Sequence, residues 1–351
     1  MGRIIPAADR RGNFLSAEDF GAAGAMTVLL KDALKPNLLQ MLEGQGAFVH
    51  AGPFANIAHG NSSVMADLVA VRYADYVVTE SGFGSDMGME KFFDIKCRVS
   101  GLAPSAAVLV AAVRALKSHG GGPAVVPEKP FPAAYREENL ELLRAGLSNL
   151  RAHLGIVRRF GIPAVVAINA FPSDTEAEWE LVKNEAVKAG AADAVVCRHW
   201  ACGGEGAAVP AGAVEAAAGG ANGADSASPQ FLYSDETPLA EKIETAAREI
   251  YGADGVDYGE GVRKELDRFE DMGYGKLPVC IAKTQYSLFH DPALKGAPSN
   301  WRLPVREARL FAGAGFVAPL CGEISAMPGL PSRPAFMDID INEEGIIRGL
   351  F

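Results

Sequence analysis

Short apolar runs alternate with longer segments of helical period along most of the chain. The apolar runs are continuous, and they lie at residues 48–49, 76–79, 107–111, 164–168, 194–196, 278–282 and 316–319. Continuous apolar runs are typical of parallel strands that are covered on both faces. Their alternation with helical segments predicts an α/β fold, with a mostly parallel sheet and flanking helices.

Three of the intervening segments carry clear helix signals. Residues 137–160 place one apolar stripe along a helix, made of Leu140, Leu143, Leu147, Leu150, Leu154 and Val157. Ser173 and Glu176 form a predicted capping box, and the helix that it opens is expected to end near Gly190. Thr237 is the predicted cap of a third helix.

Two stretches rich in glycine divide the chain, at residues 120–132 and 203–229. Such stretches are typical of loops and subdomain boundaries. Within the second stretch, residues 207–218 are expected to form a short helix and residues 219–228 a loop. A chain of 351 residues is also too long for one small core. We therefore expect three units, with the boundaries 1–133, 134–235 and 236–351.

The charge balance excludes some classes of function. The chain has 33 basic and 43 acidic side chains, and so a formal net charge of −10. A general nucleic-acid-binding protein needs a surplus of basic residues on one face, so no nucleic-acid partner is expected. The apolar run 106–113 is far shorter than a membrane span, so no membrane partner is expected either.

The five cysteines are scattered along the chain, and their number is odd. Disulfide scaffolds do not have this pattern. The first residues also contain no apolar core of the length found in signal peptides. The predicted location is the cytoplasm.

The common catalytic motifs are missing from the sequence. It contains no Gly-x-x-x-x-Gly-Lys-Ser/Thr phosphate loop, and its one Gly-Lys pair is followed by Leu277, which has no hydroxyl for magnesium. A His-Glu-x-x-His zinc motif and a Gly-x-Ser-x-Gly elbow are also absent. Cys197, His199 and Cys202 lack a fourth ligand at matched spacing, so no metal site is predicted there.

Two loops that follow predicted strands are rich in glycine and polar residues. The run at 50–60 includes Asn56 and His59, and the loop at 80–86 begins with Glu80. Loops outside the carboxyl ends of strands line the ligand crevice of open α/β sheets, and the acids of the second loop are candidates to bind a cation or its water shell. The alternative is that both loops are ordinary turns with solvated side chains.

A basic set stands out in this acidic chain, and it consists of Lys91, Lys96, Arg98, Arg114 and Lys117. Grouped lysines and arginines favour anion binding. The alternative is that each cation is paired with a nearby carboxylate.

Two aromatic residues follow neighbouring predicted strands. Asn169 ends one strand and is followed by Phe171 and Pro172, while Trp200 follows the next strand. The carboxyl ends of two strands in one βαβ unit share an edge, so both rings are expected to project into one crevice. Such a pair suits stacking on a flat heterocycle. The alternative is two core aromatics.

Taken together, these segments resemble the formate–tetrahydrofolate ligase family over residues 2–351. The matching runs are 30–38, 50–60, 76–84, 93–98, 110–121, 167–172, 200–206, 282–287 and 327–331. Many long runs in one order make the resemblance specific. It implies ATP-dependent joining of formate to tetrahydrofolate, which gives 10-formyltetrahydrofolate through formyl phosphate. It also implies Mg2+ with ATP, a monovalent cation, and a homo-oligomer, usually a tetramer.

The resemblance also implies roles for single residues. The pterin ring of tetrahydrofolate would stack on Phe171 and Trp200, with Pro172 beside them. The nucleotide and formyl phosphate side would include Asn56, His59, Glu80, Lys96, Arg98, Arg114, Asn169 and Val196. Residues 1–133 would then be the remainder of a truncated P-loop NTPase-like nucleotide-binding domain. Residues 134–235 would be a smaller folate-side α/β subdomain, and residues 236–351 a second small α/β subdomain.

Three departures from the family pattern bear on activity. The resembling enzymes carry a phosphate loop with its catalytic lysine in a long N-terminal stretch, which has no counterpart here, so no catalytic residue is assigned. Ala51 stands where the family usually has glycine, and Ala112 where it usually has threonine. The alternatives to a ligase are a non-catalytic folate- or nucleotide-binding fragment, or one half of a split ligase whose partner chain carries the phosphate loop.

Overall fold

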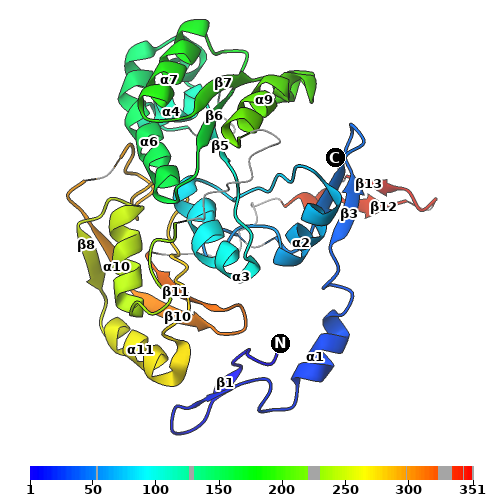
Figure 1. Cartoon of the computed structure of the whole chain (residues 1–351). Coiled ribbons are helices and arrows are strands. Elements are labelled where there is room, and N and C mark those ends of the chain that lie inside the picture. The colour runs from blue at the N-terminus through cyan, green and yellow to red at the C-terminus, as the bar shows by residue number, and fades with distance from the viewer. Residues whose placement is uncertain are drawn as a thin grey trace.

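A three-stranded parallel sheet forms the centre of the larger half of the molecule (Figure 1). Its strands lie in the order β5 (Ala107–Ala111), β6 (Ala164–Asn169) and β7 (Asp193–Cys197). The structure is a computed structural model that describes residues 1–52, 54–125, 130–219, 230–297, 299–322, 334–342 and 344–349. The predicted α/β class with a parallel sheet is confirmed, and so are the three strands predicted in this region.

Helices cover both faces of this sheet. α4 (Val113–His119), α6 (Leu140–Arg159) and α7 (Glu176–Lys188) pack on one another, and α9 (Ala208–Ala217) packs on β6 and β7 from the opposite face (Figure 1). The stripe predicted for α6 is buried, with Leu143, Leu147, Leu150, Leu154 and Val157 inside the core. Their spacing of three and four residues puts these side chains on one side of the helix.

A second parallel pair lies beside the first sheet. It joins β8 (Gly255–Tyr258) to β9 (Arg302–Val305), and α10 (Leu239–Glu249) and α11 (Val262–Phe269) lie next to it (Figure 1). β10 (Glu307–Phe311) and β11 (Phe316–Leu320) form an antiparallel hairpin. The strand predicted at 278–282 is a bridged segment, joined to β11 through Val279↔Val317 and Ala282↔Leu320.

One continuous apolar cluster extends from the first sheet to the second. It includes Leu147 of α6, Val166 of β6, Ile243 of α10, Leu266 of α11 and Val317 of β11. The expected unit boundaries at residues 133 and 235 are crossed by this core, and the division into three units stays a prediction.

Buried turns of π-helix cross the middle of the molecule, at Ser85–Met89 and Phe92–Cys97, and α3 (Arg98–Ser100) continues them. A third π-helical segment, Glu270–Tyr274, follows α11. The remaining short helices are α5 (Ala133–Arg136), α8 (His199–Cys202) and the 3-10 turns Glu205–Ala207 and Ala335–Asp338.

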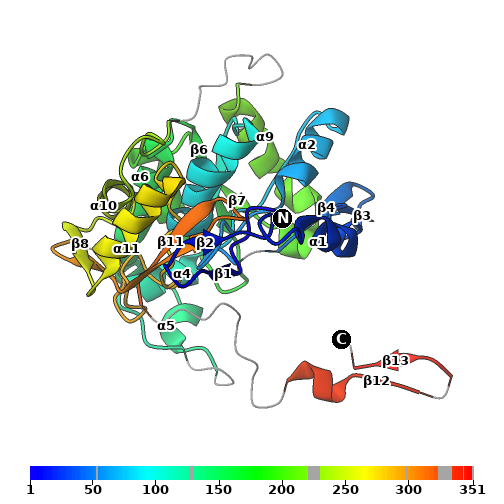
Figure 2. The ribbon, with the colours of Figure 1, turned by 90° about the horizontal axis from the view of Figure 1, so that it is seen from below.

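The N-terminal arm, residues 7–49, contributes little to the core. It contains β1 (Ala7–Ala8), β2 (Phe14–Leu15), α1 (Ala23–Leu30), β3 (Asn37–Gln40) and β4 (Gly46–Val49), and α2 (Val64–Tyr73) follows it. α1 buries none of its residues, and all four residues of β3 are exposed. Figures 1 and 2 show α1, β3 and β4 together at one side of the molecule, and a separate hairpin, β12 (Asp340–Ile341) and β13 (Ile347–Arg348), near the C-terminus.

A buried ion pair joins the helices beside the first sheet. Lys117 Nζ of α4 lies 2.6 Å from Glu178 Oε1 of α7, and both side chains are almost completely buried. The same carboxylate accepts the backbone N–H of Asn139, the cap of α6, at 3.0 Å, and the N–H of Thr175, the cap of α7, at 3.2 Å. Glu178 therefore fixes the starts of α6 and α7 to the last turn of α4.

The predicted capping box at Ser173 and Glu176 is wrong by two residues. The cap of α7 is Thr175, and Glu178 completes the box. Both pairs have the required spacing, and burial of Glu178 against Lys117 selects the second. The helix end near Gly190 is confirmed, since α7 ends at Lys188.

Two other element predictions are wrong. Residues 76–79 form no strand, because the side chains of Tyr76 and Val78 are exposed and no described strand runs beside them. The cap position of α10 is Pro238, one residue after the predicted Thr237.

The predicted loop 219–228 lies outside the described residues except for Gly219, and the run 327–331 lies outside them entirely. No helix in the described ranges is long and apolar enough to cross a membrane.

We expect Glu178→Gln to lower the free energy of unfolding by about 3–5 kcal/mol, because it leaves Lys117 buried without a counter-charge. Urea denaturation of the two proteins measures the difference. Glu180→Gln on the exposed face of α7 is the matched control, since its pair with Lys183 is solvent-exposed and contributes about 0–1 kcal/mol. Equal losses of unfolding free energy in the two variants would contradict a stabilising role for the buried Lys117–Glu178 pair.

Ala51 has a left-handed backbone with φ 49°, which explains why glycine is usual at this position in the resembling family. That conformation costs an L-residue roughly 1–2 kcal/mol. We expect Ala51→Gly to raise the free energy of unfolding by roughly 0.5–1 kcal/mol, after the greater chain entropy of glycine is subtracted. The matched control is Ala47→Gly in β4, which should lower stability in the same thermal melts.

Candidate functional site

The carboxyl edge of the β5–β6–β7 sheet brings three predicted site segments together. Arg114 lies in the first turn of α4, directly after β5, and Phe171 follows β6. Trp200 lies in α8, directly after β7. The register pairs Ala111 with Ile168 and Asn169 with Cys197, so all three strands end at the same edge. The predicted shared edge is confirmed.

A tight turn fixes the backbone of Phe171. Its N–H donates to Asp174 Oδ2 at 2.9 Å, and its carbonyl accepts the N–H of Asp174 at 3.0 Å. Trp179 Nε1 donates to the same carboxylate oxygen at 3.4 Å. Burial raises the pKa of the Asp174 carboxyl. The ring of Phe171 is half-buried and Pro172 is exposed, so the turn presents the ring at the surface of the edge.

Arg114 lies against the ring of Phe171. The central guanidinium carbon is 3.3 Å from the centroid of that ring and 5.7 Å from the centroid of Phe131. These distances are in the range of cation–π interactions. Ala112, the cap position of α4, offers no side-chain hydrogen bond, so the departure from threonine leaves this helix start uncapped.

Trp200 is 90% exposed, and among the ring contacts of the described residues none joins it to Phe171. The loop after it is met by the turn between β3 and β4, where Glu43 Oε1 accepts the N–H of Gly204 at 2.6 Å. The N-terminal arm therefore reaches the aromatic side of the edge. Asn169 and Val196 are half-buried at the ends of β6 and β7.

The two glycine-rich loops lie against each other. Asn61 forms an isolated bridge with Ser81, and its Nδ2 donates to Ser81 Oγ at 2.9 Å. Gly82 N–H donates to the carbonyl of Gly60 at 2.9 Å. Two segments that are separate in the sequence are thus joined into one wall, which carries Asn56, His59 and Glu80.

The polar groups of this wall differ in their surroundings. Burial, together with the nearby cations Lys96 and Lys91, lowers the pKa of His59. Asn56 Oδ1 is buried and has no hydrogen-bond partner in the described structure. Glu80 is exposed. The wall therefore holds an imidazole whose uncharged form is favoured and a buried amide oxygen.

Most of the predicted basic set is paired with carboxylates of the protein. Lys96 Nζ lies 2.6 Å from Asp67, and Arg98 lies 3.0 Å from Asp94 and 2.7 Å from Asp235. Lys117 is paired with Glu178, as described above. Lys91 Nζ donates to the carbonyl of Ala55. Arg114 is the member with no ion pair or hydrogen bond to any described residue.

Sequence reasoning missed a buried acid–base pair next to this wall. Lys283 Nζ lies 2.9 Å from Asp86 Oδ2, and both side chains are buried. The position of Lys283 directly after the apolar run 278–282 was the available signal. Lys283 occupies one oxygen of the Asp86 carboxylate and Glu80 is exposed, and the cation site at the loop 80–86 stays a prediction. No group of three His, Cys, Asp or Glu side chains placed to hold a metal occurs in the described ranges.

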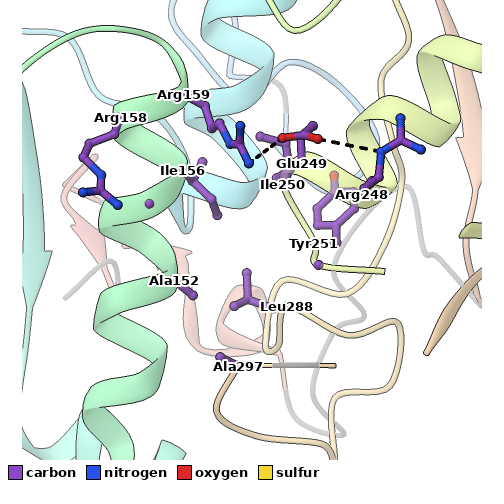
Figure 3. Close-up of a pocket in the computed structure, with 12 residues that line it drawn as sticks. Ala152, Ile156, Arg158, Arg159, Arg248, Glu249, Ile250, Tyr251, Leu288 and Ala297 are labelled. Atoms are coloured by element: carbon purple, nitrogen blue, oxygen red, sulfur yellow. Dashed lines mark ion pairs between the residues drawn. The ribbon is translucent and has the colours of Figure 1, made fainter. Parts of the chain in front are cut away.

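Two cavities lie away from the aromatic edge. The larger, about 470 Å³, is between the C-terminal turns of α6 and α10 (Figure 3). Figure 3 shows Arg159 and Arg248 directed toward Glu249, at 2.6 and 3.7 Å. α6 runs back against the strand direction, so its end is remote from the edge that carries Phe171. None of the predicted site residues lines this cavity.

The second cavity, about 390 Å³, is lined by α4, α6, residues 285–295, and Gly84 and Asp86 of the loop 80–86. It contains His119 and His153, and Ser85 Oγ lies 2.7 Å from His153 Nδ1. Burial lowers the pKa of both imidazoles, that of His119 to about 4. Nδ1 of His119 accepts the N–H of Gly296 at 3.2 Å, so this nitrogen carries no proton.

Comparison with known proteins decides the family. A family model described as formate–tetrahydrofolate ligase matches residues 1–351. The chain belongs to the formate–tetrahydrofolate ligase family. A ligase from Rubrobacter xylanophilus, formate–tetrahydrofolate ligase 2, is 52% identical over 359 residues, which is all of this chain and 62% of the relative.

Two further relatives are larger. The cytoplasmic C-1-tetrahydrofolate synthase of Schizosaccharomyces pombe is 51% identical over 362 residues, all of this chain and 38% of the relative. The mitochondrial monofunctional C1-tetrahydrofolate synthase of Bos taurus is 51% identical over 355 residues, all of this chain and 36% of the relative. The chain spans less than two thirds of the length of each of these relatives.

The pKa of His119 makes stability depend on pH. Its value of about 4 in the folded protein is below the usual 6.5, so the unfolded chain binds a proton first as pH falls. We expect the stability that depends on neutral His119 to be complete above pH 6.5 and to be lost between pH 6.5 and 4. His119→Asn keeps an oxygen acceptor for Gly296 and should flatten this part of a Tm-against-pH curve. Parallel Tm-against-pH curves for the two proteins would show that His119 does not cause this pH dependence.

Proposed function

We propose that this chain contributes the folate-binding part of a formate–tetrahydrofolate ligase, which joins formate to tetrahydrofolate with ATP and gives 10-formyltetrahydrofolate. The observation that carries the proposal is the ring of Phe171, which a fixed turn presents at the carboxyl edge of a parallel sheet. Ligands of open α/β sheets bind at this edge. The family match over the whole chain supports tetrahydrofolate as the proposed ligand.

The chemistry proceeds in two transfers in this proposal. An oxygen of formate attacks the γ-phosphorus of ATP, ADP leaves, and formyl phosphate forms. A nitrogen of tetrahydrofolate then attacks the formyl carbon, phosphate leaves with the electrons of the broken C–O bond, and the proton of that nitrogen ends on the released phosphate. Formate itself is a poor acyl donor, so the phosphate leaving group makes the second transfer possible. In this proposal Mg2+ accompanies ATP, and a monovalent cation assists the reaction.

The folate side is proposed at Phe171, Pro172 and Trp200, and the nucleotide and formyl phosphate side along the wall with Asn56, His59 and Glu80. Asn169 and Val196 end the strands between these two sides. Lys96 and Arg98 are paired with acids, so their contribution to a phosphate site would be indirect, through the position of the buried turns.

A second candidate is a split ligase, in which another polypeptide supplies the phosphate loop, or a fragment that binds folate or a nucleotide without catalysis. The sequence holds no phosphate loop, and transfer of a phosphoryl group relies on such a lysine. The uncovered apolar surface favours a partner, because Val110 on the outer strand β5 is 65% exposed and Leu29 of α1 is 85% exposed. A homo-oligomer is the other proposed way to cover this surface, and the cytoplasm is the proposed compartment.

The folate side is tested by calorimetric titration of tetrahydrofolate into the chain. We expect Phe171→Ala and Trp200→Ala each to weaken binding by about 1–3 kcal/mol, the range for loss of one stacked ring. Phe20→Ala is the control, because Phe20 is an exposed ring on the N-terminal arm. Unchanged affinity in both variants would rule out stacking on these residues.

A separate activity assay measures the formation of 10-formyltetrahydrofolate from formate, ATP and tetrahydrofolate. The chain is assayed alone and mixed with a polypeptide that carries the family's phosphate loop. Product in the mixture supports a split ligase, whereas binding without product in either assay supports the non-catalytic alternative.

A further inference from the structure

The side chain of Arg114 lies over the ring of Phe171. Its guanidinium carbon lies 3.3 Å from the ring centroid of Phe171, and Phe131 is the next ring at 5.7 Å. The planar guanidinium therefore covers one face of the Phe171 ring at contact distance. A flat ligand that stacks on this ring has only the opposite face available.

A comparison with Arg98 shows what Arg114 lacks. Arg98 also lies over rings, those of Phe231 at 4.1 Å and Tyr233 at 5.0 Å, but its N–H groups are taken by Asp94 and Asp235. Arg114 has no carboxylate or hydrogen-bond acceptor among the described residues. No described residue therefore accepts a hydrogen bond from the N–H groups at the edge of this guanidinium.

The surroundings favour an anion at this edge. The fork of N–H groups on a guanidinium matches the oxygens of a phosphate. Arg114 is half-buried in the first turn of α4, and it has no carboxylate partner among the described residues.

We propose that Arg114 binds a phosphate group, free or esterified or in an acyl phosphate, and holds it beside a flat ring stacked on the opposite face of Phe171. Arg114 thereby joins the two half-sites of the proposed reaction, since one side chain contacts the anion through its edge and the aromatic platform through its face. The identity of the stacked ring as a pterin rests on the proposed function, whereas the anion site rests on the geometry of Arg114 alone.

Such an arrangement couples the two ligands. An anion on the N–H edge fixes the guanidinium, and the guanidinium fixes the ring that the second ligand needs. Coupling between two sites is reciprocal, and its usual size is about 5- to 150-fold in affinity. We expect inorganic phosphate to tighten tetrahydrofolate binding by about tenfold, at constant ionic strength set with potassium chloride.

The test uses calorimetry on the full chain with two probes, inorganic phosphate alone and tetrahydrofolate with or without phosphate. Arg114→Met should weaken phosphate binding by about 10- to 100-fold, the value for hydrogen bonds to a charged group, and should abolish the coupling. Arg114→Lys retains the charge but loses the planar stack, so it should recover part of the phosphate affinity and little of the coupling. Arg144→Met, at an exposed arginine of α6, is the matched control.

Each outcome decides the proposal. Loss of phosphate binding and coupling in Arg114→Met, with a thermal melt like that of the unaltered chain, supports it. Phosphate binding that is equal in the unaltered chain and Arg114→Met overturns it, and so does tetrahydrofolate binding that does not respond to phosphate. If tetrahydrofolate fails to bind the unaltered chain, the proposed folate function fails, while the phosphate titration still accepts or rejects the anion site.

Discussion

The buried pair of Lys117 and Glu178 is the constraint on which the ligand edge depends. Glu178 receives the ammonium group of α4 and the first backbone N–H groups of α6 and α7. Burial of both charges is tolerated because these partners occupy the carboxylate from several sides. The turn that carries Phe171 lies directly before α7, and Arg114 lies one turn before Lys117 on α4. One ion pair therefore sets the distance between the arginine and the ring.

The cations of the predicted basic set differ in their partners. Lys96, Arg98 and Lys117 are satisfied by carboxylates, and so they stabilise the packing of the buried turns and helices. Among the described residues Arg114 contacts aromatic rings, and none of them accepts a hydrogen bond from its donors. The sequence presents all of them as one basic set, because the pairing depends on acids that are distant in the chain. The distinction between structural and ligand-binding cations therefore required the fold.

Much of the fold could be predicted because its signals are local. The stripe of α6 and the apolar runs of β5, β6 and β7 follow from periodicity, and the shared edge of Phe171 and Trp200 follows from the handedness of βαβ units. The cap of α7 failed because Ser173 and Thr175 both fit the motif, and a tertiary contact of Glu178 selects between them. The contact of Arg114 with Phe171 depends on how β5 and β6 align, which no local pattern encodes.

A crystal structure of the chain with tetrahydrofolate and phosphate would test directly whether Phe171 stacks on the pterin while Arg114 binds the phosphate. We expect a pterin ring parallel to Phe171, on the face opposite Arg114, with a phosphate within hydrogen-bonding distance of the guanidinium. A ligand in the cavity between α6 and α10 would contradict it, and so would a pterin that displaces Arg114 from the ring.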